Sequence, residues 1–261
     1  MSARIRFLGV AGYELVGSTG RVLVDPFLTG NPLAPVSPET IERPDVILVS
    51  HAAYDHLGDA AEIALRTGAP VVCGGDVRLH LLDAGVPDPQ IRPTVWGIVV
   101  RVGGQTVRPL ECHHWSMRML NDMPVTGTPL AFIVEPEPGI RLYHYGDTAI
   151  FDMRLFGELY RPHVGIFGCT NPVELLEHDP AAGELLTGEM DPDEAALAAE
   201  MLGVDIALAS HYMRPTPDLD VFLDRVAVRD STGRRIGLAP AVGQTLVIDR
   251  ADGSITYRLE S

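Results

Sequence analysis

The stretch VSHAAYDHLGD, residues 49–59, decides how this chain is interpreted. It continues an apolar run, DVILVS at residues 45–50, which is bounded by turns and is typical of a strand buried on both faces. His51, Asp55 and His56 follow that run directly, so imidazole and carboxylate groups gather at a strand end. Ala53 stands two residues after His51, where another histidine would complete a cluster of metal ligands. The stretch therefore predicts a metal site that lacks one ligand.

Other strand-like segments also end in candidate ligands. His113 and His114 follow QTVRPLEC, Asp147 follows IRLYHYG, and His211 follows VDIALAS. Because strand ends meet at one edge of a sheet, loops there can bring distant side chains into one site. Such a mixture of imidazole and carboxylate suits zinc, iron or manganese better than calcium, which prefers oxygen ligands alone.

A lone histidine at a strand end is more often a surface or hydrogen-bonded group than a ligand. The chain also carries His80, His144, His163 and His178, which we assign to that ordinary class. Recurrence after the same kind of strand is what distinguishes the predicted ligands, which are His51, Asp55, His56, His114, Asp147 and His211.

The order of the elements predicts the fold class. Strand-like segments open the chain and fill residues 95–145, and each group is followed by helical segments, at residues 57–68, 191–202 and 216–227. Asp191 is the expected N-cap of the second helix, with Pro192 at its first position. Strands followed by helices, twice over, predict an α/β four-layer αββα sandwich. No linker divides the chain, so we expect one domain over residues 1–261.

Composition limits the partners. The 261 residues are 46% hydrophobic and carry a formal net charge of -15, which disfavours nucleic acid as a general partner because a phosphate backbone needs a basic face. The three cysteines have no CxxC spacing, as expected in a reducing cytoplasm. The amino terminus enters strand-like sequence directly, and no apolar run is long enough for a membrane span. We expect a cytoplasmic protein with a small-molecule substrate. The sequence leaves open whether the protein forms a homo-oligomer.

At these residues the chain resembles the metallo-β-lactamase superfamily. The family signature is HxHxDH followed by a distant His, a distant Asp and a final His; here it reads HAAYDH, HHWS, YGDT and ASHY. FLGVAGYEL, VLVDPFLTGNPLAP and PDEAALAAEML look like the branch of small metal-dependent hydrolases related to ascorbate-6-phosphate lactonase. HWSMR is similar to the corresponding segment of N-acyl-phosphatidylethanolamine phospholipase D. The resemblance implies a hydrolase that uses a metal-activated water.

Matching positions carry the family roles onto this chain. One metal would have His51 and His114, with its remaining ligand missing at Ala53, and the other would have Asp55, His56 and His211. Asp147 would bridge the two metals. The implied catalytic residues are Asp55, His56, His114, Asp147 and His211. The implied cofactor is a divalent metal, with zinc preferred and manganese or iron as alternatives.

Two neighbours of the ligands have supporting roles in this scheme. His114 is preferred to His113 as the ligand because it immediately precedes WS, as the family histidine does. His113 then supports the ligands from outside or replaces one of them. Asp25, in VDPF, holds the histidine loop in the family pattern, although an Asp-Pro pair can also simply form a turn.

Ala53 cannot ligate a metal, because a methyl group has no lone pair. We expect the first metal position to be weak or empty and the second to be occupied. Two interpretations stay open: a lineage with a single-metal site, or an engineered variant of a parent that reads HAHYDH and binds two metals. The second is favoured because every other position of the signature is intact.

The substrate is less well determined. The resemblance favours a small cyclic ester or amide, with a phosphodiester of the phospholipase D-like branch as one alternative and a catalytically degenerate binding protein as the other. Residues beside the ligands, expected to contact substrate, are Tyr54, Arg118, Tyr212 and Arg214. The stretch at residues 169–194 is either a lid over the site or an acidic surface excursion.

Overall fold

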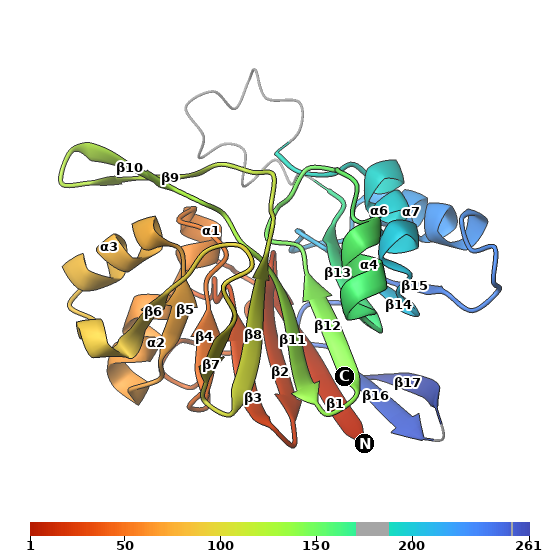
Figure 1. The fold of residues 1–261 in the computed structure, drawn as a ribbon, viewed down its shortest axis with the longest axis horizontal. Coiled ribbons are helices and arrows are strands. Elements are labelled where there is room, and N and C mark those ends of the chain that lie inside the picture. The colour runs from red at the N-terminus through yellow and green to blue at the C-terminus, as the bar shows by residue number, and fades with distance from the viewer. Residues whose placement is uncertain (171–187, 252) are drawn as a thin grey trace.

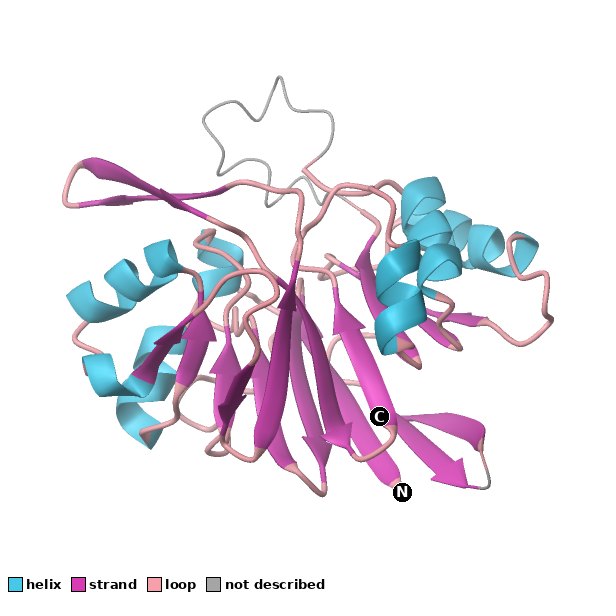
Figure 2. Cartoon of the chain, viewed as in Figure 1, coloured by secondary structure: helices cyan, strands magenta, loops and turns pink. Residues whose placement is uncertain are grey.

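Two β-sheets packed face to face, with helices on their outer sides, form the computed structural model, which describes residues 1–170, 188–251 and 253–261 (Figure 1). The described helices flank the sheets on opposite sides of the molecule (Figure 2). The predicted four-layer αββα sandwich is thus confirmed. Most of the stretch at residues 169–194, expected to be either a lid or an acidic surface excursion, lies outside the described residues, as does His178 within it.

The first sheet carries the strand that precedes His51. Its strands, in order across the sheet, are β17 (Ser254–Glu260), β16 (Thr245–Ala251), β1 (Ser2–Gly9), β2 (Gly12–Gly17), β3 (Gly20–Val24), β4 (Val46–Leu48), β5 (Val71–Cys73) and β6 (Ile91–Pro93). Pairing is antiparallel from β17 to β3 and parallel from β3 to β6. The C-terminal ends of β3, β4 and β5 therefore meet at one edge.

The second sheet supplies the other predicted ligands. Its strands, in order, are β15 (Ile236–Leu238), β14 (Ile206–Ser210), β13 (Val164–Gly168), β12 (Ile140–His144), β11 (Ala131–Glu137), β8 (Gln105–Leu110) and β7 (Val100–Val102). The strands β12 to β15 run parallel, so β12 and β14 end at the same edge. A separate hairpin of β9 (Ser116–Leu120) and β10 (Met123–Gly127) extends away from the sandwich (Figure 1).

Helices cover the outer faces. On the first sheet lie α2 (Ala60–Thr67) and α3 (Gly75–Asp83), whose Ile63 and Val77 share an apolar cluster with Ile47 of β4. On the second lie α4 (Arg154–Tyr160), α6 (Pro192–Leu202) and α7 (Pro217–Val228). Short helical turns, α1 (Tyr54–Leu57) and the 3-10 helix Asp88–Gln90, complete the described helical structure.

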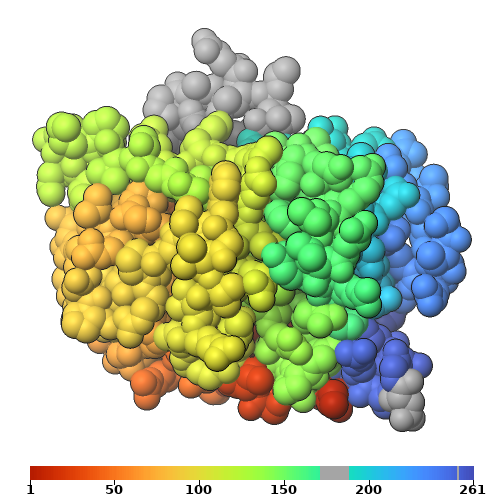
Figure 3. Space-filling view, viewed as in Figure 1, coloured from red at the N-terminus to blue at the C-terminus, as the bar shows by residue number. Residues whose placement is uncertain are grey.

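The main core lies between the sheets, where side chains that alternate along the strands interdigitate. Phe7 and Leu15 of the first sheet and Phe132 and Ile166 of the second are fully or almost fully buried in one cluster. In the view of Figure 3 the second sheet and α4 cover this core, so the red amino-terminal strands are visible only at the lower rim. This rigid sandwich is the scaffold from which the site loops project.

Local sequence signals explain some helix boundaries and miss others. The helix at 191–202 begins as predicted, with Asp191 as N-cap, Pro192 in the first turn, and Glu194 completing a reciprocal capping box. Short α1, α3 and α4, and the β9–β10 hairpin, have no counterpart in the predicted pattern. The three cysteines are buried and free, and no helix in the described ranges is long and apolar enough to cross a membrane.

Candidate metal centre

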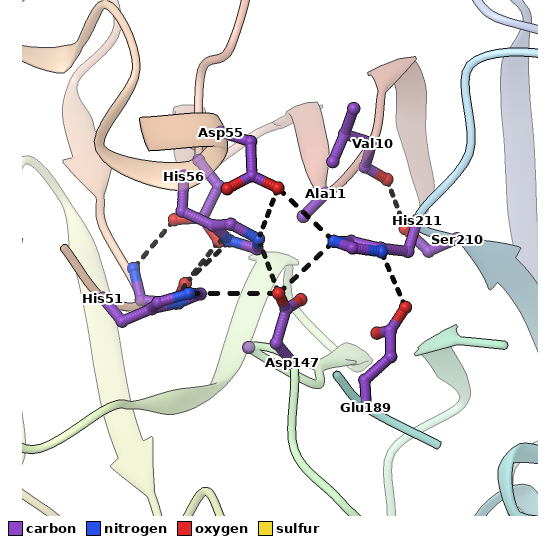
Figure 4. Close-up of polar contacts among 12 residues, drawn as sticks. Val10, Ala11, His51, Asp55, His56, Asp147, Glu189, Ser210 and His211 are labelled. Atoms are coloured by element: carbon purple, nitrogen blue, oxygen red, sulfur yellow. Dashed lines mark hydrogen bonds and ion pairs between the residues drawn. The ribbon is translucent and has the colours of Figure 1, made fainter. Parts of the chain in front are cut away.

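The candidate ligands converge where strands of both sheets end, as Figure 4 shows for most of them. His51 follows β4, and Asp55 and His56 lie in the short helix α1 that comes next. His114 follows β8, Asp147 follows β12, and His211 follows β14 directly. Residues that are widely separated in sequence thus face one small volume because they share an edge of the sandwich.

The backbone at this edge is in an unusual conformation. Asp25, Asp147 and His211 have φ values of 41°, 65° and 69°, in the left-handed region that L-residues seldom adopt. Val10, with a φ of 55°, accepts a hydrogen bond from His211 N at 2.8 Å and donates one to the Tyr212 carbonyl at 2.9 Å. Such conformations persist where the surrounding structure holds them, and they gather at functional sites. The clamp at Val10 fixes the main chain of His211.

The group of Asp55, His56, His211 and Asp147 has the dimensions of a metal site. The Asp147 Oδ2 atom lies 2.8 Å from His56 Nε2 and 3.3 Å from His211 Nε2. Asp55 Oδ2 lies 3.5 Å from His211 Nε2 and 3.8 Å from His56 Nε2. Ligand atoms about 2.0–2.1 Å from a tetrahedral ion lie about 3.3 Å from one another, so these separations fit a single cation.

A second group shares Asp147. Ligand atoms of His51, His114 and Asp147 all lie within 4.8 Å of one another, and His51 Nε2 is 3.9 Å from Asp147 Oδ2. The rings of His51 and His114 meet edge to face with centroids 4.9 Å apart. Ala53, at the start of α1, is half-buried and contributes only backbone. This group therefore offers three protein ligands.

Unpartnered polar atoms within the cluster indicate that a cation belongs there. Nε2 of His51, His56 and His211 and Oδ1 of Asp147 are buried, yet have no hydrogen-bond partner among the described residues. Buried polar atoms ordinarily have hydrogen-bond partners, so several unpartnered atoms within one cluster need an explanation. A bound divalent ion supplies it, because these nitrogens and oxygens are the ligand types of zinc, iron and manganese.

Hydrogen bonds behind the ligands aim His56 at this volume. Its Nδ1 lies 2.9 Å from Asp25 Oδ2, which leaves Nε2 to face Asp147. Asp25 is fully buried and accepts hydrogen bonds from Ser50 N at 2.8 Å and Ser50 Oγ at 2.6 Å. The same hydroxyl lies 3.0 Å from His51 Nδ1. Asp25 thus contacts the histidine loop, and Ser50 links its two histidines.

Electrostatics divide the histidines into two classes. Burial, together with the neighbouring imidazoles, lowers the pKa of His51 and of His114, so both are neutral and ready to donate a lone pair. Burial alone would also lower the pKa of His56 and His211, but the Asp147 carboxylate, helped by other carboxylates, raises both well above the ordinary value. In return these histidines hold the pKa of Asp147 well below its usual range, against the effect of burial. Without metal, protons occupy the positions that a cation would take.

Some predicted neighbours lie away from the cluster. His113 pairs with Glu111 at 2.7 Å and stacks on Phe151, so it stands at the surface and belongs to neither ligand group. This contradicts its interpretation as a substitute ligand.

Of the expected substrate residues, the structure contradicts Tyr212 and leaves the others as predictions. Tyr212 is buried, and its hydroxyl donates to the Pro240 carbonyl at 2.5 Å, so it serves the core. Arg118 shares a face of β9 with Ser116, whose hydroxyl donates a hydrogen bond to Asp76 of α3. Burial lowers the pKa of His80 in the same helix, and the positive charge of Arg118 lowers it further. The interaction that the structure gives Arg118 is thus with α3, and this residue is absent from the lining of the cavity beside His114. Tyr54 is half-buried and packs edge to face on Phe27, and Arg214 is exposed.

Two residues of the site are not among those that the sequence predicted. Ser50 is one, and its position immediately before His51 at a strand end is the feature that would have revealed it. Glu189 is the other. Its carboxylate is buried 2.7 Å from His211 Nδ1 (Figure 4), and burial raises its pKa to about 8. An acidic residue two positions before an N-cap is typical of the protein surface, so the sequence alone does not predict its burial.

A cavity of about 430 Å³ adjoins the cluster and is lined by His113, His114, Trp115, Ala149, Gly188 and Glu189. This volume falls within the range of small-molecule sites. The indole of Trp115 stacks on the ring of His114, with centroids 4.7 Å apart, so the cavity opens directly beside a candidate ligand.

Comparison with known proteins gives consistent matches. Residues 20–212 match the model of the β-lactamase superfamily domain. The chain is 36% identical over 213 residues to a UPF0173 metal-dependent hydrolase of Rubrobacter xylanophilus, covering 80% of this chain and 81% of that protein. A relative from Methanopyrus kandleri is 36% identical over 212 residues, covering 80% and 84%.

Solved structures agree on the fold. Igni18, a metallo hydrolase from Ignicoccus hospitalis, superposes with a TM-score of 0.75 at 23% identity, covering 96% of this chain and all of that one (100%). An isothiocyanate hydrolase from Delia radicum gut bacteria superposes with a TM-score of 0.64 at 17% identity, covering 93% and 97%.

Proposed function

The chain belongs to the metallo-β-lactamase superfamily of metal-dependent hydrolases, and from this premise we propose that it hydrolyses a small cyclic ester or amide. The observation that carries the proposal is the cluster of Asp55, His56, Asp147 and His211, whose spacing fits one cation. The two histidine Nε2 atoms of the cluster have no hydrogen-bond partner among the described residues. We assign this group as the main metal position, with zinc as the first choice of metal.

The roles of the residues follow from their positions. When bound, a divalent metal supplies a water that is acidic enough to react near neutral pH and an electrophile for the substrate carbonyl. His56 and His211 would hold the ion through Nε2, and Asp147 stands between the two ligand groups. Asp55 would be the carboxylate that orients the water and takes up its proton in turnover. No serine or cysteine of the chain is needed as a nucleophile.

The cavity supports a small neutral substrate over a phosphate ester. Its lining in the described residues has no lysine or arginine, and Arg118, the cation nearest in sequence to His114, faces α3 instead. A phosphodiester would be expected to meet at least one cationic side chain. A lactone or cyclic amide needs only a surface to pack against, which Trp115 provides beside His114.

A substrate panel tests the proposal. Zinc-loaded protein is assayed with lactones, cyclic amides and phosphodiesters, with Asp147→Asn as the control for contaminating activity. Turnover of a lactone or amide that is lost in Asp147→Asn supports the proposal. Preferential turnover of phosphodiesters would assign the chain to the phospholipase D-like alternative. Metal binding without turnover of any class, in this chain and in Ala53→His alike, would favour the binding-protein alternative.

A further inference from the structure

The carboxylate of Glu189 is buried beside the metal centre, where a charged group is costly to hold. Glu189 is only 3% exposed, and beyond an ion pair with one histidine neither carboxylate oxygen has a hydrogen-bond partner among the described residues. Burying a carboxylate is costly, so such a group persists where it acts on the neighbour it pairs with. The neighbour in contact is His211, whose Nδ1 lies 2.7 Å from Glu189 Oε1.

The chain makes room for this contact. A Cβ atom on Gly168, the last residue of β13, would stand only 1.6 Å from Glu189 Oε2, so the carboxylate occupies the space that any other residue at 168 would fill. From the other side, Asp191 begins α6 with its capping box and fixes the main chain two residues after Glu189. Strand and helix together hold the carboxylate against the histidine.

The arrangement repeats the one behind His56. There, Asp25 Oδ2 lies 2.9 Å from Nδ1, and Nε2 faces Asp147. At His211, Glu189 is on the Nδ1 side and Nε2 faces the same Asp147 oxygen at 3.3 Å (Figure 4). Carboxylates that accept the outer N–H of a ligating histidine fix its tautomer and its orientation. Both histidines of one ligand group thus have a buried carboxylate behind them.

We propose that Glu189 is a positioning residue of the metal centre: it accepts the Nδ1–H of His211 and thereby presents the Nε2 lone pair to the cation. The inference rests on the proposed metal centre and adds a residue to it. The Thr170 carbonyl, 3.3 Å from the same Nδ1, is a weaker neutral acceptor that does not replace the charge of the carboxylate.

Zinc affinity tests the proposal without reference to any substrate. The affinity of the full chain is measured by chelator competition for the wild type, Glu189→Met, Glu189→Gln and Glu200→Gln. Glu200 is an exposed carboxylate of α6 paired with Arg229, and serves as the matched control. Glu189→Met keeps the volume and removes the acceptor, and we expect a loss of roughly 10–100-fold. Glu189→Gln retains an acceptor oxygen and loses less, and Glu200→Gln loses nothing.

Nitrogen-15 NMR of the zinc-loaded chain supplies a second readout. We expect a bonded Nδ1–H on His211 in the wild type, shifted in Glu189→Gln because the acceptor has lost its charge. If Glu189→Met fails to fold by circular dichroism, this comparison decides: an unshifted resonance overturns the proposal. So does a loss below about tenfold in folded Glu189→Met. Equal losses in Glu189→Met and Glu189→Gln, with a changed cobalt absorption spectrum, would make Glu189 a direct ligand and also overturn it. A wild type that binds no zinc would instead refute the proposed function.

Discussion

Restoring a histidine at position 53 is the most informative change that the sequence offers. Ala53 has φ −56° and ψ 149°, which a histidine adopts without strain, and its carbonyl bonds to His56 N and Leu57 N do not involve the side chain. The side chain is half-buried at the start of α1, two residues after His51. Ala53→His should therefore fold like the original chain and add a ligand to the His51–His114–Asp147 group.

The size of the effect follows from mass action. With zinc at about 100 times the dissociation constant of a newly formed site, binding stabilises the folded state by about 2.7 kcal/mol. For a chain of this length that corresponds to a rise in Tm of roughly 5–11 °C. We expect metal content to rise from about one toward two per chain, and the hydrolytic rate to rise by orders of magnitude because the two-metal arrangement is restored.

Metal analysis of the dialysed proteins and thermal unfolding with and without zinc measure these quantities. A chelated sample of each protein is the control, since the two should then unfold alike. If Ala53→His gains neither metal nor activity, then position 53 does not face the first metal site, and the interpretation of this chain as a ligand-deleted variant is wrong.

Other changes test separate parts of the site and fold. Asp147→Asn should bring the zinc content below one per chain, because this carboxylate lies 2.8 Å from His56 Nε2 in one ligand group and 3.9 Å from His51 Nε2 in the other; unchanged content would contradict that. In the metal-free protein, the raised pKa values of His56 and His211 stabilise the folded state fully below about pH 6.5, and this stabilisation is lost as pH rises through the folded-state pKa values. Zinc must displace the protons on these histidines, so the affinity for zinc should increase from about pH 6 to about pH 8. An affinity that does not change with pH would count against this. His113→Ala should leave the zinc content unchanged, since this ring pairs with a surface glutamate, and a loss would restore it as a ligand. Asp191→Ala should lower the free energy of unfolding by about 1 kcal/mol in denaturant titrations through loss of the capping box, and no change would mean that the box contributes nothing.

The sequence predicted the layers of the fold because its strands are strongly apolar and its later helices are well capped. β4 and β14 are buried along their whole length, and α6 has its N-cap, its proline and its capping-box glutamate in register. The helix α3 was missed because its apolar residues have no clear helical stripe and it begins at Gly75 without a side-chain cap. Short α1 and α4 are held by tertiary packing more than by local signals.

The ligand groups were predictable in part for the same reason. Candidate ligands placed directly after buried strands must meet at the sheet edge, and clusters of His51 with His114 and of Asp55 with His211 do form there. Side-chain direction was not predictable from spacing. Tyr212 follows a ligand directly but turns into the core, because His211 in the left-handed region redirects the chain. Glu189 could not be predicted from the sequence either, because its burial depends on the space that Gly168 leaves for the carboxylate.

Anomalous diffraction from crystals of the zinc-loaded chain, recorded on both sides of the zinc absorption edge, tests the central claim most directly. We predict a peak bounded by Asp55, His56, His211 and Asp147, with a weaker peak or none between His51 and His114. A chain that takes up no zinc, or whose peak lies away from these residues, would contradict the assignment of this edge of the sandwich as the metal centre.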